Sequence, residues 1–122
     1  MIQKEHLRIG NLVKYGTAIY IVDELRDNNI TLCDSEFIPD TYYGTYAEIE
    51  PIPLTEDLLV RLGFVQKESV YTLRLASFEL VFYKYSNSLE FYLESVGVDI
   101  MYAHQLQNLI FALSGTNLKL NP

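Results

Sequence analysis

The sequence lacks most of the residue patterns that catalytic and metal sites need. Cys33 is its single cysteine, and it has two histidines, His6 and His104. These three residues match no zinc spacing, and one thiol cannot form an internal disulfide, so we expect a cytoplasmic protein. No Gly-rich phosphate loop and no serine in a nucleophile elbow occurs. We therefore expect no enzyme, no catalytic residue, no metal and no cofactor.

Long apolar runs and an excess of positive charge are also missing. No run approaches the roughly 18–20 apolar residues of a membrane span. The opening MIQKEHLRIG has no apolar core, so we expect no secretory signal and no membrane attachment. The formal net charge is −7, and residues 1–53 carry nine acidic but only four basic side chains. Such a chain repels phosphate backbones, which argues against direct nucleic-acid binding.

What is present predicts an α+β protein. The chain has 122 residues, 49% of them hydrophobic, which suits one compact unit built from two modules, 1–53 and 54–122. In the first module, short apolar segments are separated by turns at 10–11, 16–17 and 27–29. This spacing predicts a small curled sheet that resembles an SH3-like barrel.

A tyrosine-rich segment closes the first module. DSEFIPDTYYGTY (34–46) is predicted to be a long loop that carries Tyr42, Tyr43 and Tyr46. Pro51 and Pro53 follow, and they favour an extended edge strand or linker.

The second module is predicted to begin with a short helix, capped by Thr55 and ended by Gly63 in a Schellman motif. Three to four antiparallel strands follow, at about 65–75, 78–85, 90–95 and 98–102. We expect the C-terminal helix to cover the apolar face of this sheet.

The register of the hairpin near residue 87 follows from its side chains. An even loop pairs Tyr85 with Glu90 and Tyr83 with Tyr92. Since a slip of one residue exchanges the two faces of a strand, this register is favoured because it separates two sets of side chains. One face then carries Phe78, Leu80, Phe82, Phe91 and Leu93, and the other carries Glu79, Tyr83, Tyr85, Glu90, Tyr92 and Glu94.

The C-terminal helix is expected over Ala103–Ser114, with Gly115 ending it. Nothing is charged between Asp99 and Lys119, although a solvent-facing helix back usually carries lysine or glutamate. The side opposite the leucine stripe carries His104, Gln107, Asn108 and Phe111. We expect this side to be covered, and the sequence leaves open whether the cover is the chain itself or a partner.

Three motifs together carry a family resemblance that spans the chain. LRIGNLV, IEPIPLTEDLLVRLGF and YAHQLQNLIFALSG resemble, in the same order, segments of uncharacterised small proteins from gut bacteria, their prophages and mobile elements. This sequence departs from that pattern at Ala103, Ile110 and Ser114. The resemblance implies a shared fold and a genomic setting, and it implies no activity.

The predicted binding residues are therefore aromatic and amide side chains. Tyrosine combines rigid contact area with a polar tip, as recognition surfaces require, although half-buried sheets also favour it. We predict a non-enzymatic accessory protein that binds another protein or itself. The alternative is a small-molecule binder that sequesters a nucleotide against host defence, with scattered cations as the phosphate donors. The two sets of candidates are Tyr42, Tyr43, Tyr46, Tyr83, Tyr85, Tyr92, His104, Gln107, Asn108 and Phe111 for the protein surface, and Arg8, Lys14, Arg26, Arg61, Arg74 and Lys84 for phosphate.

Overall fold

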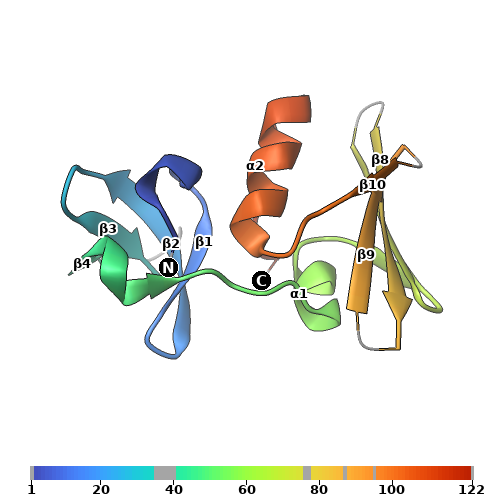
Figure 1. Cartoon of the computed structure of the whole chain (residues 1–122), viewed down its shortest axis with the longest axis horizontal. Helices are drawn as coiled ribbons and strands as arrows, with labels where there is room; N and C mark the ends of the chain where they lie inside the picture. Colours follow the sequence, from blue (N-terminus) through green and yellow to red (C-terminus); the bar gives the residue numbers. More distant parts are fainter. Residues whose placement is uncertain (1, 35–40, 76–77, 87, 95, 122) are drawn as a thin grey trace. The chain divides into compact units, whose positions relative to one another are not determined.

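The computed structural model describes residues 2–34, 41–75, 78–86, 88–94 and 96–121 of an α+β chain that is mostly β. The chain forms two compact units, each made of two segments. The first unit is Met1–Pro53 together with Tyr102–Leu109, and the second is Leu54–Met101 together with Ile110–Pro122. Each unit contains one five-stranded antiparallel sheet (Figure 1). The sequence assigned all of 54–122 to one module, so it did not anticipate that residues 102–109 join the first unit.

The first sheet has the order β4-β3-β2-β1-β5. One of its faces carries the core of the unit, where Val13, Val22 and Leu32 are at most 1% exposed. A short 3-10 helix, η1 (Lys4–His6), precedes the first strand, and a second, η2 (Tyr46–Glu48), precedes the last. The strands are β1 (Leu12–Tyr15), β2 (Ala18–Leu25), β3 (Ile30–Cys33), β4 (Thr41–Gly44) and β5 (Ile49–Glu50).

The second sheet is a meander in which every strand pairs with its neighbour in sequence. Its inner face is apolar and aromatic: the ring of Phe82 lies 5.5 Å from that of Phe64 and 4.7 Å from that of Phe91. The strands are β6 (Val65–Lys67), β7 (Val70–Leu75), β8 (Phe78–Tyr85), β9 (Ser88–Leu93) and β10 (Val96–Val98).

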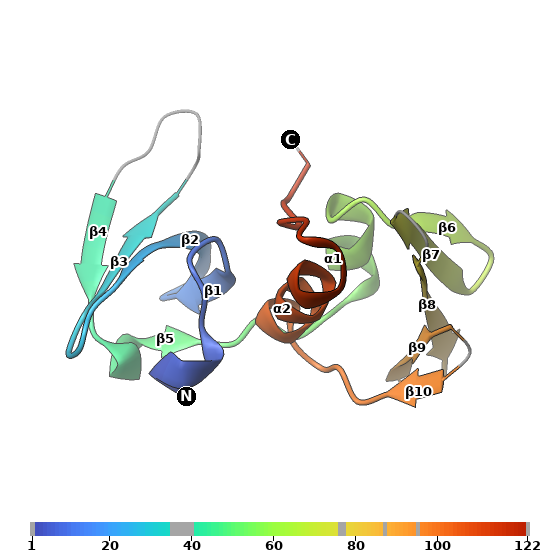
Figure 2. The ribbon, with the colours of Figure 1, turned by 90° about the horizontal axis from the view of Figure 1, so that it is seen from above.

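Helix α1 (Glu56–Arg61) lies on the inner face of this sheet (Figure 2). The Tyr71 hydroxyl on β7 donates a 2.6 Å hydrogen bond to the Glu56 carboxylate. This hydrogen bond, with burial as a smaller cause, raises the pKa of Tyr71 to about 12. The predicted start and end of α1 are confirmed. Leu58 N–H donates to the Thr55 hydroxyl at 3.2 Å, and Gly63, at φ 103°, leaves the helix with two Schellman hydrogen bonds.

Helix α2 (Ala103–Ser114) has the predicted bounds. Gly115 ends it with φ 72°, and its N–H donates to the Phe111 carbonyl at 2.8 Å. From Ala103 to Ile110 no side chain is exposed, whereas Phe111 and Ala112 are. The predicted cover of the helix back therefore holds for its first two turns and fails at Phe111, which is 41% exposed.

The strand predictions need four corrections. The second sheet has five strands where three to four were expected. The segment 65–75 is two strands, because Glu68 turns the chain with φ 58°, which non-glycine residues rarely adopt. The last strand lies at 96–98 and not at 98–102. Within the loop predicted over 34–46, residues 41–44 form β4, and residues 35–40 lie outside the described part of the chain.

The β8–β9 register is correct in its faces and wrong in its pairs. Tyr85 pairs with Ser88 and Tyr83 with Glu90, two residues away from the predicted pairing. A shift of two residues keeps every side chain on its predicted face. The apolar pairs Leu80–Leu93 and Phe82–Phe91 accordingly share the inner face.

Candidate functional site

The amides of the final helix close a hydrogen-bond network inside the first unit. The Gln107 side chain, 1% exposed, accepts a hydrogen bond from Leu12 N–H at 2.7 Å. Its Nε2 donates to the Gly10 carbonyl at 3.1 Å. Gln107 therefore supplies hydrogen-bond partners to backbone groups at the start of β1, as a neighbouring strand would. Its role at this position is structural.

Asn11 and Asn108 extend this network. Asn11, fully buried, donates from Nδ2 to the Asn108 Oδ1 at 2.9 Å, and its own Oδ1 accepts from Arg8 N–H at 2.6 Å. The Asn108 Nδ2 donates to the His6 carbonyl at 2.9 Å. The buried amides hold residues 6–12 against α2, and they leave few groups to offer a ligand.

His104 is buried, 5% exposed, and its ring is stacked on Tyr102 with centroids 6.0 Å apart. Within the described chain its Nδ1 has no hydrogen-bond partner. Burial, with a smaller contribution from the charge of His6, lowers the pKa of His104. No carboxylate contacts this imidazole among the described hydrogen bonds and ion pairs, so a base oriented by an acid is not assembled there.

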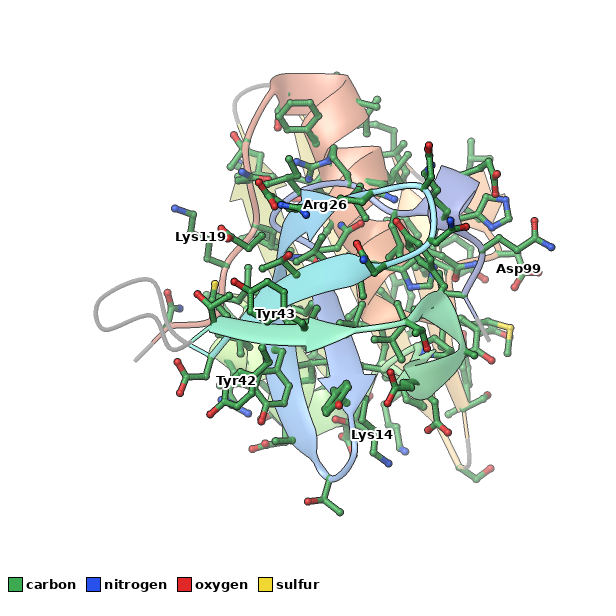
Figure 3. All side chains as sticks on the ribbon, turned by 90° about the vertical axis from the view of Figure 1, so that its left-hand side faces the viewer. Lys14, Arg26, Tyr42, Tyr43, Asp99 and Lys119 are labelled. Carbon is green, nitrogen blue, oxygen red and sulfur yellow. The ribbon has the colours of Figure 1, made fainter. Side chains whose placement is uncertain are left out.

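The structure does not bring Tyr42, Tyr43 and Tyr46, the predicted tyrosines of the first unit, to one surface. Tyr42 and Tyr43 alternate on β4, so their side chains leave opposite faces of the sheet (Figure 3). Tyr42 meets the ring of Tyr20, with centroids 5.0 Å apart, whereas Tyr43 is 75% exposed. Tyr46 packs on the core, and its hydroxyl donates to the Arg26 carbonyl.

Three tyrosines of the second unit, Tyr83, Tyr85 and Tyr92, do share one surface. The strand alternation puts Tyr83, Tyr85 and Tyr92 on the outer face of the second sheet, opposite the face of Phe82 and Phe91. The rings of Tyr83 and Tyr92 meet edge to face with centroids 5.3 Å apart. Tyr83 is 38% exposed and Tyr85 is 50% exposed.

Further residues of β6 to β9 extend this surface, which we call the outer face. The registers place Val65, Thr72, Val81 and Tyr92 in one row across β6 to β9. The next row is Lys67, Val70, Tyr83 and Glu90. Sequence reasoning missed Val65 and Val70 because it did not divide 65–75 into two strands. The positive φ of Glu68 that divides them has no clear sequence signal.

The charges on the outer face are separated by sign. Lys67 and Arg74 lie on β6 and β7, and Glu79 and Glu90 lie on β8 and β9. Arg74 contacts the Glu79 carboxylate at 2.7 Å. The Tyr92 hydroxyl donates to Glu90 at 3.2 Å, and this bond raises the pKa of Tyr92. Val70 and Tyr83 thus lie between the charges of Lys67 and Glu90, whereas Arg74 and Glu79 are direct neighbours on adjacent strands.

Of the cations proposed for phosphate binding, three lie beside carboxylates, and the two that Figure 3 labels in the first unit lie apart. In the first unit, Lys14 and Arg26 lie at opposite ends of the sheet (Figure 3), and Arg26 pairs with Glu24 at 2.8 Å. In the second, Arg74 pairs with Glu79, and Lys84 lies 3.6 Å from Glu56.

Among the described residues, no three His, Cys, Asp or Glu side chains are grouped so that they could hold a metal ion. None of the described helices has the length and hydropathy needed to cross a membrane.

Comparison with known proteins gives this chain no relative. No protein-family model, no curated protein and no solved structure matches it.

Proposed function

We propose that this chain is a non-enzymatic protein-interaction module whose binding surface is the outer face. The observation that carries the proposal is the exposed stripe of valine and tyrosine on an open sheet. Val65 is 69% exposed and Tyr85 is 50% exposed, and both are large apolar or aromatic side chains. Aromatic residues with polar tips are enriched in protein interfaces, where their rigid rings add contact area at low entropic cost.

The contrast with the other candidates supports this choice. Gln107 and Asn108 are engaged in hydrogen bonds within the chain. The tyrosines of β4 are divided between two faces. Phe111, 41% exposed, is one residue on a helix end. Among the candidate surfaces of the described residues, the outer face alone combines several exposed aromatic and aliphatic side chains.

Site-specific photo-crosslinking tests the proposal. A photoreactive phenylalanine analogue at Tyr85 should give crosslinked protein adducts in an extract of the source cells. The same analogue at Tyr43, which is 75% exposed on the other sheet, is the matched control. Adducts at Tyr85 and not at Tyr43 are the expected result. Their absence at Tyr85, or an equal yield at both positions, would contradict the proposed surface.

Nucleotide sequestration is the less favoured alternative. Three of the candidate cations, Arg26, Arg74 and Lys84, already lie beside carboxylates. Binding a phosphate there would require breaking these ion pairs without a cluster to replace them. Isothermal titration with a panel of nucleotides would show heat of binding only if this alternative were true.

Two finer features of the fold belong to the same proposal. A strand order in which β5 returns beside β1, with a 3-10 helix before β5, supports an SH3-like barrel in the first unit. The apolar inner face of the second sheet supports α2 as its cover.

An origin in a phage or mobile element rests on the sequence resemblance. Two of its motifs, RIGN (8–11) and HQLQN (104–108), meet in the amide network, which gives these motifs a structural reason to occur together.

A further inference from the structure

We infer that the occupant of the outer face is a second copy of this chain, bound face to face about a two-fold axis that runs along the strands between β7 and β8. The inference rests on the proposed function and names the partner. It follows from the separation of charge on this face, because that separation is self-complementary for one orientation of the axis and repulsive for the other.

The geometry can be worked out row by row. A two-fold axis parallel to the strands exchanges the two sides of the sheet and keeps each row opposite itself. With the axis between β7 and β8, Lys67 of one copy faces Glu90 of the other, and Arg74 faces Glu79. Each contact occurs twice in the dimer. An axis across the strands would instead place the positive charges of both copies against each other.

The apolar rows match under the same operation. Val70 of one copy faces Tyr83 of the other, and Val65 faces Tyr92. Aliphatic side chains of one copy therefore face aromatic rings of the other, and neither Tyr83 nor Tyr92 faces the same tyrosine of the second copy. Two sheets packed face to face with aligned strands, about 10 Å apart, form the arrangement of a β-sandwich.

Within one copy these charges do not satisfy each other completely. Lys67 on β6 and Glu90 on β9 are three strands apart, which corresponds to about 14 Å at the usual strand spacing. The second copy brings an opposite charge over each of them. Lys67 and Glu90 thus gain an ion pair in the dimer, in addition to the hydrogen bond that Glu90 accepts from Tyr92 within one copy.

The size of the outer face sets the expected affinity. Four strands of up to eight residues would bury on the order of 1,000 Å² in total over the two copies. This lies at the lower end of specific interfaces, so the dimer should be weak and should dissociate in the micromolar range.

Sedimentation velocity of the full chain across the micromolar range is the test. The wild type should shift from monomer to dimer as its concentration rises. Lys67→Glu places a carboxylate opposite Glu90 of the other copy, and Glu90→Lys places two cations together. Each should weaken the dimer about tenfold, because every altered contact counts twice. The double variant should restore it. Lys119→Glu, the same charge reversal on another exposed lysine, should leave the equilibrium unchanged.

Each outcome separates the dimer from the broader proposal. A chain that stays monomeric at every concentration, yet forms crosslinks at Tyr85 with a different protein, overturns the second copy and keeps the interaction surface. A monomer without crosslinks overturns both. A dimer that Lys67→Glu strengthens refutes the axis along the strands, since that result requires the positive charges of the two copies to face each other.

Discussion

The amide network of the first unit and the outer face of the second use polar side chains in opposite ways. In the network, Gln107 and Asn11 are at most 1% exposed, and each makes several hydrogen bonds within the chain. On the outer face, Tyr83 and Tyr85 keep more than a third of their surface exposed. Both regions contain residues that the sequence marks as binding candidates. Their burial distinguishes the structural residues of the network from the exposed candidates of the outer face.

The comparison distinguishes residues that stabilise the fold from residues that are available for binding. A buried amide costs free energy unless it is hydrogen-bonded, so a satisfied one stabilises the position that it occupies. An exposed tyrosine on a sheet contributes less to folding, because much of its ring stays in water. Substitutions in the two regions should therefore separate stability from association.

The largest effect is expected at Gln107. Gln107→Leu keeps the volume and removes both hydrogen-bonding groups, which leaves the Leu12 N–H and the Gly10 carbonyl without their partner. A buried, unsatisfied polar group costs about 1–3 kcal/mol, so losing two partners should lower the free energy of unfolding by about 2–4 kcal/mol. Urea denaturation followed by circular dichroism measures this change.

Gln66→Leu is the matched control for that substitution. Gln66 is exposed on β6, and its Nε2 donates to the Glu68 carbonyl at 3.2 Å in a surface hydrogen bond. Its replacement should change the free energy of unfolding by less than about 0.5 kcal/mol. If the two glutamine variants were equally stable, the network would not hold the first unit together.

A smaller effect is expected at His104 as the pH falls. Its pKa in the folded state lies below the ordinary value of 6.5, so the unfolded chain binds a proton more readily than the folded one. The stability that neutral His104 supplies is therefore complete above pH 6.5 and is lost as the pH falls from 6.5 towards the lower folded value. Protonated His104 carries an N–H donor on both ring nitrogens, and the buried Nδ1 has no acceptor within the described chain.

Denaturation curves between neutral and mildly acidic pH test this prediction. His104→Gln removes the titrating group, so its free energy of unfolding should fall less steeply with decreasing pH than that of the wild type. Parallel pH profiles for the two proteins would show that His104 titrates alike in the folded and unfolded states.

The sequence predicted the elements whose ends carry local signals. Thr55, Gly63 and Gly115 bound the two helices through caps that depend on neighbouring residues, and both helices have the expected ends. The faces of β8 and β9 were predicted from the alternation of apolar and polar side chains. A shift of two residues in the register leaves each side chain on the same face. The turn at Glu68 was missed because a glutamate at positive φ is held by its surroundings and not by its own preference.

The candidate surface was predicted in part for the same reason. Tyr83, Tyr85 and Tyr92 could be placed on one face, because they lie on one hairpin. Tyr42 and Tyr43 were grouped as loop residues, and β4 separated them by alternation. The role of Gln107 needed a contact with residues 95 to 97 positions away in sequence, and no local pattern contains such pairings.

A small effect on stability is expected on the outer face, at Tyr83. Its edge-to-face contact with Tyr92 is a cross-strand pair, and such pairs contribute roughly 0.2–1 kcal/mol. Tyr83→Ser should therefore lower the free energy of unfolding by at most about 1 kcal/mol, measured at a dilution where the chain is monomeric. The same variant should lose the concentration-dependent association seen in sedimentation. If Tyr83→Ser instead destabilised the monomer as much as Gln107→Leu, the outer face would be part of the folded core, and its tyrosines would no longer distinguish recognition from architecture.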